Sequence, residues 1–313
     1  MEPELKPISP KKILLGNIAL VIVKSIAYLV VIVLAIILGL GLMSIILPET
    51  SMASMTTTDF YDWETLNYQY LGQAIGVVLS TLAFRYFVDK KDYRSMGLGF
   101  NQLGLYLGKG IVWAVGILSL AFLLIWAIGN IQILGTQDLG IALAGYLSFF
   151  LLVAIVEEVI CRGYLLQMVT DHLNYQVGIA VSAIVFTLAH LANDHFTWIA
   201  FCNLTLGGIL MSLLYLKYQS LYVPIGFHWL WNYFQGNILG FGVSGTDVLG
   251  LLQINTEGPD WLTGGYFGLE GSLITCLILA IAIYILWTNS KDQLELIAME
   301  KSLNMSNMHS QSG

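Results

Sequence analysis

Two adjacent glutamates follow an uncharged, apolar stretch in the middle of the chain. Residues 139–156 carry no charge, and Glu157, Glu158 and Arg162 come directly after them. Ionisable groups inside such a segment are costly and are by default candidates for a functional site. On a helix, Glu158 and Arg162 lie four residues apart on one face and can pair. Glu157 points about 100° away from Glu158, so we interpret it as the chemical group and the pair as structural support.

Two histidines and an asparagine lie in later apolar stretches. His190 is near the end of residues 177–191, while His228 and Asn232 share one helix face within residues 222–238. Together with Glu157 these groups can support hydrolysis. A carboxylate in an apolar pocket can accept a proton from water, and a neighbouring histidine can share that water. We therefore expect Glu157 and His190 to activate water, and His228 and Asn232 to stabilise the oxyanion of a tetrahedral intermediate.

A zinc site is the alternative chemistry for the same residues. Two histidines and a carboxylate form the ligand set of several catalytic zinc sites, so Glu157, His190 and His228 would be the ligands and the activity would be that of a metallopeptidase. The chain has no H-E-x-x-H motif, and these groups come from three separate stretches. Its three cysteines are isolated in apolar runs, which argues against a thiolate metal site or a disulfide framework. We therefore predict no cofactor, with zinc kept as the alternative.

The composition indicates an integral membrane protein. Of the 313 residues, 57% are hydrophobic and 11% are charged, whereas a soluble domain has about 25% charged residues. The net charge of −7 comes without a basic stripe, so we expect no nucleic-acid partner. We predict an all-α, multi-pass fold in contact with membrane lipids.

About eight apolar stretches are long enough to cross a bilayer, since a crossing takes about 20 residues. They are residues 25–47, 66–84, 110–134, 139–167, 177–191, 196–216, 222–238 and 272–287, with residues 13–23 as an extension of the first or an interfacial segment. The expected organisation is a tail over residues 1–12, one membrane domain over 13–288 and a polar tail over 289–313. The catalytic core, residues 139–238, comes from spans four to seven.

The basic residues give the orientation of this layout. All Lys and Arg residues except Lys24 and Arg162 fall on one side. The long loops on the opposite side, 48–65 and 239–271, contain Asp and Glu but no Lys or Arg. The positive-inside rule then places both termini in the cytoplasm, and we expect the plasma membrane. Lys24 would snorkel or make a polar contact inside the bundle.

The depth of the candidate groups is compatible with a shared cavity. At about 1.5 Å of rise per residue, Glu157, His190 and His228 lie roughly 15, 20 and 10 Å from the inner ends of their spans. We therefore expect them to meet in one cavity below the cytoplasmic surface.

Seven residues form three motifs, E-E-x-x-x-R, F-x-x-x-H and H-x-x-x-N, in this order and on separate spans. They are Glu157, Glu158, Arg162, Phe186, His190, His228 and Asn232. This pattern resembles the CAAX protease and bacteriocin-processing (Abi) family, which includes the type II CAAX prenyl endopeptidases. The resemblance covers residues 157–232 and the eight-span layout.

The resemblance implies an intramembrane, glutamate-type endopeptidase. The residues that match Glu157 and His190 would activate water, those that match His228 and Asn232 would support the oxyanion, and Glu158 and Arg162 would have a structural role. The substrate would be a peptide or a membrane-associated protein, with a lipid anchor as one option.

Two other functions are compatible with the same sequence. The family also contains immunity and regulatory members, so a non-catalytic membrane protein of the Abi type is the main alternative. A transporter that uses Glu157 and the histidines as a proton relay is disfavoured, because no inverted repeat or pair of broken helices is evident.

Overall fold

The computed structural model describes residues 10–46, 63–296 and 299. The expected N-terminal tail up to residue 9, the loop over 48–62 and the end of the C-terminal tail lie outside these residues. Residues 10–12, assigned to the tail, begin the first helix. Residues 291–296, assigned to the other tail, are helical, and Leu294 is buried.

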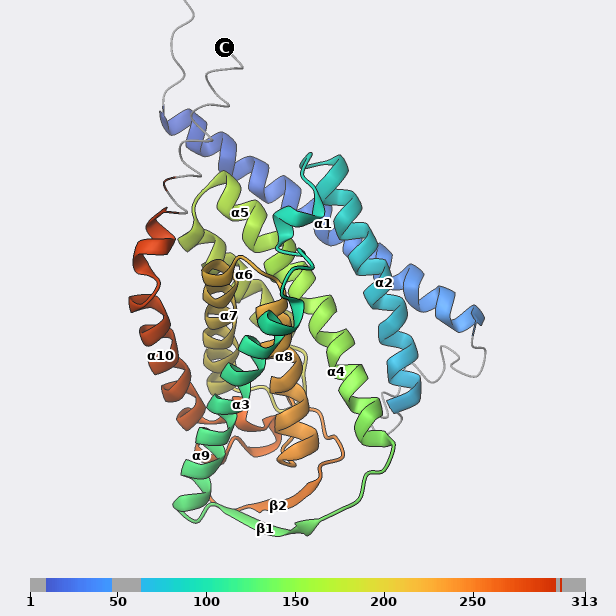
Figure 1. The fold of residues 1–313 in the computed structure, drawn as a ribbon, viewed down its shortest axis with the longest axis vertical. Coiled ribbons are helices and arrows are strands. Elements are labelled where there is room, and N and C mark those ends of the chain that lie inside the picture. The colour runs from blue at the N-terminus through green and yellow to red at the C-terminus, as the bar shows by residue number, and fades with distance from the viewer. Residues whose placement is uncertain (1–9, 47–62, 297–298, 300–313) are drawn as a thin grey trace, which may run out of the picture.

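The described part of the chain is mostly helical (Figure 1). Its α-helices are α1 (Pro10–Ile46), α2 (Trp63–Phe87), α3 (Leu103–Ala127), α4 (Ala142–Glu158), α5 (Leu166–His172), α6 (Tyr175–Ala189), α7 (Trp198–Tyr218), α8 (Tyr222–Tyr233), α9 (Asp260–Thr263) and α10 (Leu273–Thr288). Two π-helical segments, Val159–Leu165 and Phe234–Ile238, follow α4 and α8 directly. Short 3-10 turns occur at Tyr93–Met96, Gly265–Phe267 and Leu269–Gly271.

A helical segment occupies each of the eight predicted spans, but among the described residues four helices are long and apolar enough to cross a membrane. They are Lys11–Ile46, Leu103–Ala127, Ala142–His172 and Trp198–Tyr218. The helices α6 and α10 are apolar but shorter. The protein is therefore an integral membrane protein with four clear candidate spans, while the count of eight stays a prediction.

The all-α prediction is wrong in one detail, because the structure contains a two-stranded antiparallel sheet. Strand β1 (Ile131–Thr136) pairs with β2 (Leu252–Thr256). The third span was predicted to reach residue 134, but α3 ends at Ala127, and Gly129 adopts a left-handed conformation with φ 84°. A short apolar run cannot be assigned to helix or strand from periodicity alone, and the run after Gly129 is a strand.

Helix α8, which carries His228 and Asn232, lies at the centre of the bundle. It packs against α3, α4 and α7, while α2 covers α4, and α6 packs on α7 (Figure 1). Two glycines let α3 and α8 approach closely. A Cβ atom at Gly226 would lie 2.4 Å from the Leu107 carbonyl oxygen, and one at Gly110 would lie 2.0 Å from that of Val223. Small residues at such helix contacts are typical of membrane proteins.

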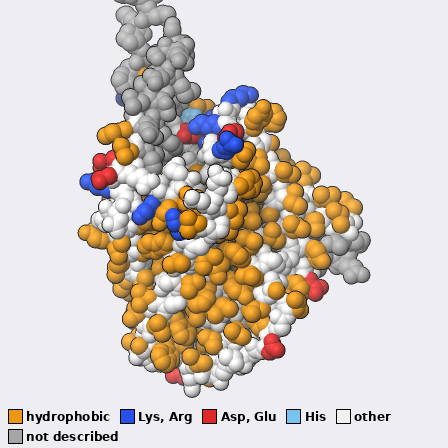
Figure 2. Space-filling model, in the orientation of Figure 1, with side chains coloured by type: hydrophobic (Ala, Val, Ile, Leu, Met, Phe, Trp, Pro, Cys, Tyr) orange, Lys and Arg blue, Asp and Glu red, His pale blue; other side chains and the backbone are white. Residues whose placement is uncertain are grey.

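Basic side chains gather at one end of the face shown in Figure 2, and apolar side chains cover most of the rest of that face. We call this the basic end; it is where α1 begins and where α2 and α5 end (Figure 1). Near the basic end, Lys24 of α1 pairs with Asp89 at 2.6 Å, which is the polar contact considered for it above. Asp89 also pairs with Arg85, and Asp171 pairs with Arg85 and Lys91. These ion pairs connect α1, α2 and α5.

The α3–α8 contact yields a prediction about stability. Gly226→Ala should lower the melting temperature of the purified protein, because overpacking of a close contact typically costs about 1–3 kcal/mol and the atom that the new Cβ meets belongs to the backbone of Leu107. Gly116→Ala in α3 is the matched control, since a Cβ there meets nothing within 4 Å. An equal melting temperature for the two variants would contradict the close contact.

Candidate active site

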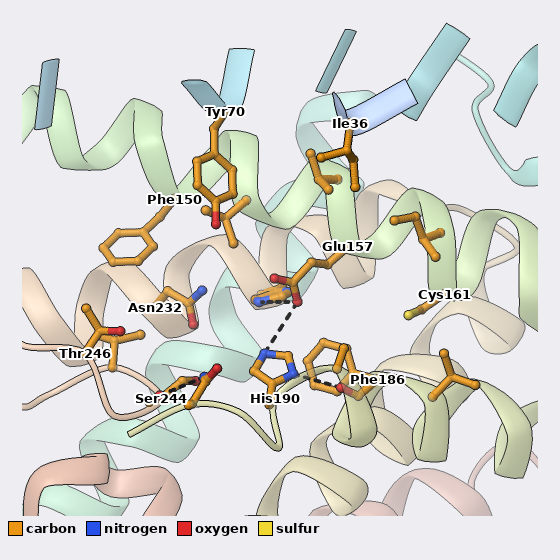
Figure 3. Close-up of a pocket in the computed structure, with 18 of the residues that line it drawn as sticks. Ile36, Tyr70, Phe150, Glu157, Cys161, Phe186, His190, Asn232, Ser244 and Thr246 are labelled. Carbon is orange, nitrogen blue, oxygen red and sulfur yellow. Dashed lines mark hydrogen bonds and ion pairs between the residues drawn. The ribbon is translucent and has the colours of Figure 1, made fainter. Parts of the chain in front are cut away.

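The structure brings Glu157, His190 and His228 together at one cavity of about 450 Å³ (Figure 3). The Oε2 atom of Glu157 lies 3.7 Å from Nε2 of His190 and 3.9 Å from Nε2 of His228. Both separations exceed a direct hydrogen bond, and this buried oxygen has no hydrogen-bond partner among the described residues. A gap of this size between polar groups is where a water molecule can bridge.

The adjacent glutamates face different surroundings, as their helix positions predict. Glu157 keeps 28% of its side chain exposed to the cavity, whereas Glu158 and Arg162 are fully buried and pair at 2.7 Å. Arg162 also donates to the Gly208 carbonyl at 3.1 Å and lies over the ring of Phe186. This pair therefore anchors α4 against α6 and α7.

The π-helical segment directly follows these glutamates. The Leu166 N–H donates to the carbonyl of Cys161 five residues earlier, and Ser182 of α6 donates its hydroxyl to the same carbonyl at 3.0 Å. Such widened turns within helices occur often at functional sites. Here the widened turn connects the end of α4, which carries Glu157, to α5, and α6 packs against it.

Each histidine is oriented through its Nδ1 atom. In His190, Nδ1 lies 2.8 Å from the Phe186 carbonyl, and in His228 it lies 3.0 Å from Oε1 of Glu158. A carbonyl and a carboxylate oxygen accept hydrogen bonds, so Nδ1 is the protonated nitrogen in both rings. Both Nε2 atoms are consequently left to face Glu157 and the cavity.

The contact between Glu158 and His228 was not predicted from the sequence. We interpreted Glu158 as part of a structural pair only, yet one oxygen, Oε1, accepts from both Arg162 and His228. Because Glu158 and His228 are 70 residues apart, no local spacing could indicate this contact. Glu158 is thus the buried acceptor that sets the orientation of His228.

Asn232 lines the same cavity, on the helix that carries His228. None of the hydrogen bonds among the described residues involves its side-chain amide, which points into the cavity in Figure 3. Tyr70 of α2 also lines the cavity, and its ring packs edge-on against Phe149 at 5.0 Å. No pattern in the sequence predicted a role for Tyr70.

The cavity lies deeper than we expected. Glu157 is the middle residue of the 31-residue helical segment Ala142–His172, rather than close to its basic end. Part of the wall comes from the loop 239–271, which was predicted to lie on the far side, through Val243, Ser244, Thr246 and Val248. The opposite wall is apolar and comes from α1, namely Leu29, Ile32, Val33 and Ile36.

The zinc alternative can be compared with this geometry. Histidines that bind zinc often donate Nδ1–H to a carbonyl or carboxylate, as His190 and His228 do here. Within the described residues, however, no group of three or more His, Cys, Asp or Glu side chains is spaced to hold a metal ion. The positions of Glu157, His190 and His228 in this structure thus do not form a ready ligand set.

The buried pair yields a second prediction. Glu158→Gln should destabilise the protein by about 3 kcal/mol, because removing one partner of a buried ion pair leaves the other charge uncompensated. Glu295→Gln is the matched control, since the Lys291–Glu295 pair is exposed and its atoms are 4.0 Å apart. Thermal unfolding of both variants in the same detergent measures the difference, and a Glu158→Gln variant as stable as the control would refute the role of Glu158.

Comparisons with known proteins agree with the motifs. The sequence model of the family described as "Type II CAAX prenyl endopeptidase Rce1-like" matches residues 139–234. This range contains Glu157, His190, His228 and Asn232. No curated protein and no solved structure matched the chain. Residues 139–234, which hold the site, are therefore similar to the type II CAAX prenyl endopeptidases of the CAAX protease family.

Proposed function

We propose that this protein is an intramembrane glutamate-type endopeptidase that hydrolyses peptide bonds of a peptide or a membrane-associated protein. The similarity of residues 139–234 to type II CAAX prenyl endopeptidases supports peptidase activity. The observation that carries the mechanism is the convergence of the Glu157 carboxylate with Nε2 of both histidines, at 3.7 and 3.9 Å, in an otherwise largely apolar cavity.

Water activation is the first step of the proposed reaction. A water molecule between Oε2 of Glu157 and Nε2 of His190 would donate its two protons to these acceptors. Glu157 takes one proton as the oxygen attacks the carbonyl carbon of the substrate. His190 is already oriented by the Phe186 carbonyl, and Glu157 lies in the last turn of α4 with an Oε2 atom that has no partner among the described residues.

Oxyanion stabilisation is the second requirement. The amide of Asn232 can donate to the developing oxyanion. His228 can donate from Nε2 only as an imidazolium, because Glu158 already accepts from its Nδ1. When the tetrahedral intermediate collapses, Glu157 returns its proton to the leaving amine, and the carboxylate is regenerated.

The orientation in the membrane is part of the proposal. The basic end would face the cytoplasm, as the positive-inside rule requires, and both termini would lie there. The hydrogen bond from Gln293 to the Lys217 carbonyl supports this, because it places the last described helical turns beside a basic residue. We further propose eight crossings, a plasma-membrane location and contact with membrane lipids.

Substitution of the two water-binding residues tests the mechanism. Glu157→Gln and His190→Ala should each lower kcat by about 10²–10⁴-fold, the usual contribution of general acid–base catalysis, without changing the melting temperature. The assay is cleavage of a quenched-fluorescent peptide library by protein in lipid nanodiscs, with products identified by mass spectrometry.

His195→Ala is the matched control for these variants, because His195 stacks on Tyr266 and does not line the active-site cavity. It should cleave at the wild-type rate. Cleavage by Glu157→Gln at that same rate would refute the catalytic assignment. If the wild-type protein cleaves nothing, the non-catalytic Abi-type alternative gains support.

Metal dependence is tested separately. We expect wild-type cleavage to persist after dialysis against a strong chelator, because the proposed steps use only side chains and water. The opposite outcome is a loss of activity in the chelator that added Zn²⁺ restores in the wild-type protein but not in the Glu157→Gln protein. That outcome would make Glu157, His190 and His228 zinc ligands.

A further inference from the structure

A thin segment of the loop after α8 separates two cavities. Its core is a tight hairpin in which Val243 and Thr246 exchange backbone hydrogen bonds of 2.8 and 2.9 Å. The two residues at the tip, Ser244 and Gly245, have φ angles of 50° and 85°. We call residues 243–248 the hairpin segment.

The two faces of the hairpin segment line different cavities. Val243, Ser244, Thr246 and Val248 line the active-site cavity, as Glu157 does. Gly245 and Asp247, which alternate with them, line a second cavity of about 420 Å³ together with His195 and Tyr266. One layer of backbone therefore bounds the active-site cavity at the end away from the basic end.

A buried carboxylate holds the hairpin segment in place. Oε2 of Glu270 accepts from the Ser244 N–H at 2.8 Å and from the Ser244 hydroxyl at 2.7 Å. Its other oxygen, Oε1, accepts from the indole N–H of Trp231 at 2.8 Å. Glu270 is 5% exposed, and hydrogen bonds to a charged acceptor are about twice as strong as neutral ones. Asn193 adds a further bond of 2.9 Å to the Ser244 carbonyl.

The groups that carry the chemistry are held independently of this wall. His190 is oriented by Phe186 within its own helix, and His228 by Glu158 of α4. Neither bond involves the hairpin segment or Glu270. Displacing the wall would therefore change the space available to the substrate more than the position of the reacting groups.

We propose that the hairpin segment, fixed by Glu270, is a specificity-determining wall that limits the size of the substrate side chain at this end of the cavity. The wall offers two valines and the hydroxyl of Thr246, so it suits a small, uncharged side chain. Loosening it would join the cavity to the space behind it and admit larger side chains. This inference rests on the proposed peptidase function.

The test compares Glu270→Gln with wild type on quenched-fluorescent peptides that differ only in the size of one side chain beside the cleaved bond. The glutamine amide would point an N–H donor at either Ser244 or Trp231. For Glu270→Gln, the preference in kcat/KM for small over large side chains should fall by roughly tenfold, the scale on which hydrophobic pockets discriminate size. The change should lie in KM, with kcat for the small peptide preserved.

Two further variants separate a positioning role from a general loss of structure. Trp231→Phe removes the donor to the other oxygen of Glu270 and leaves both hairpin bonds, so it should keep the wild-type preference. Ser244→Ala removes one of the two bonds and should give an intermediate preference. An unchanged preference in Glu270→Gln, or an equal change in Trp231→Phe, would overturn the proposal.

Hydrogen–deuterium exchange of the same proteins without substrate gives a readout that needs no turnover. The amides of residues 243–246 should exchange faster in Glu270→Gln than in wild type and Trp231→Phe, while those of α8 stay unchanged. Equal exchange in all three would show that Glu270 does not fix the wall. A wild-type protein that cleaves no peptide would refute the proposed function, and the exchange result would stand apart from it.

Discussion

The buried carboxylate of Glu158 is the interaction on which the rest of the site depends. One of its oxygens accepts from Arg162 at 2.7 Å and from His228 at 3.0 Å, and all three side chains are buried. An isolated charge is costly in an apolar interior, so Arg162 and Glu158 offset each other's charge, and His228 adds a second hydrogen bond to the same carboxylate oxygen. Because the three come from α4, the π-helical segment and α8, this contact also fixes the position of α8 relative to α4.

The arrangement explains why two consecutive acids are needed. Glu158 points into the protein, where it is fully buried, and Glu157 points into the cavity, where more than a quarter of its side chain is exposed. One turn of helix therefore supplies both a charge that orders the interior and a carboxylate that can meet water. The acids differ only in direction, which the helix sets at about 100° per residue.

Much of this site could be predicted from the sequence, because charged and imidazole groups are conspicuous in apolar helices. Glu157, His190, His228 and Asn232 were identified in this way, and the structure places them around one cavity. The positions of the helices followed from apolar runs, since burial against lipid or protein requires them.

Other features carried no such signal. The contact of Glu158 with His228 depends on the packing of α8 against α4, and Glu270 lies in a glycine-rich loop where neither helix nor strand periodicity applies. The sheet of β1 and β2 was missed because a six-residue apolar run fits helix and strand equally. Each miss involves a contact between segments distant in sequence, which pattern reasoning does not reach.

The reacting groups and the cavity walls are encoded in different parts of the chain. The family match over residues 139–234 contains every group of the proposed reaction. The apolar wall from α1, the ring of Tyr70 and the hairpin segment with Glu270 all lie outside that range. Since the groups inside the match orient one another through Glu158 and Phe186, the surrounding walls can change shape without displacing them. If the chain is the proposed endopeptidase, this division lets one reaction be kept while the substrate changes through α1, α2 and the loop after α8.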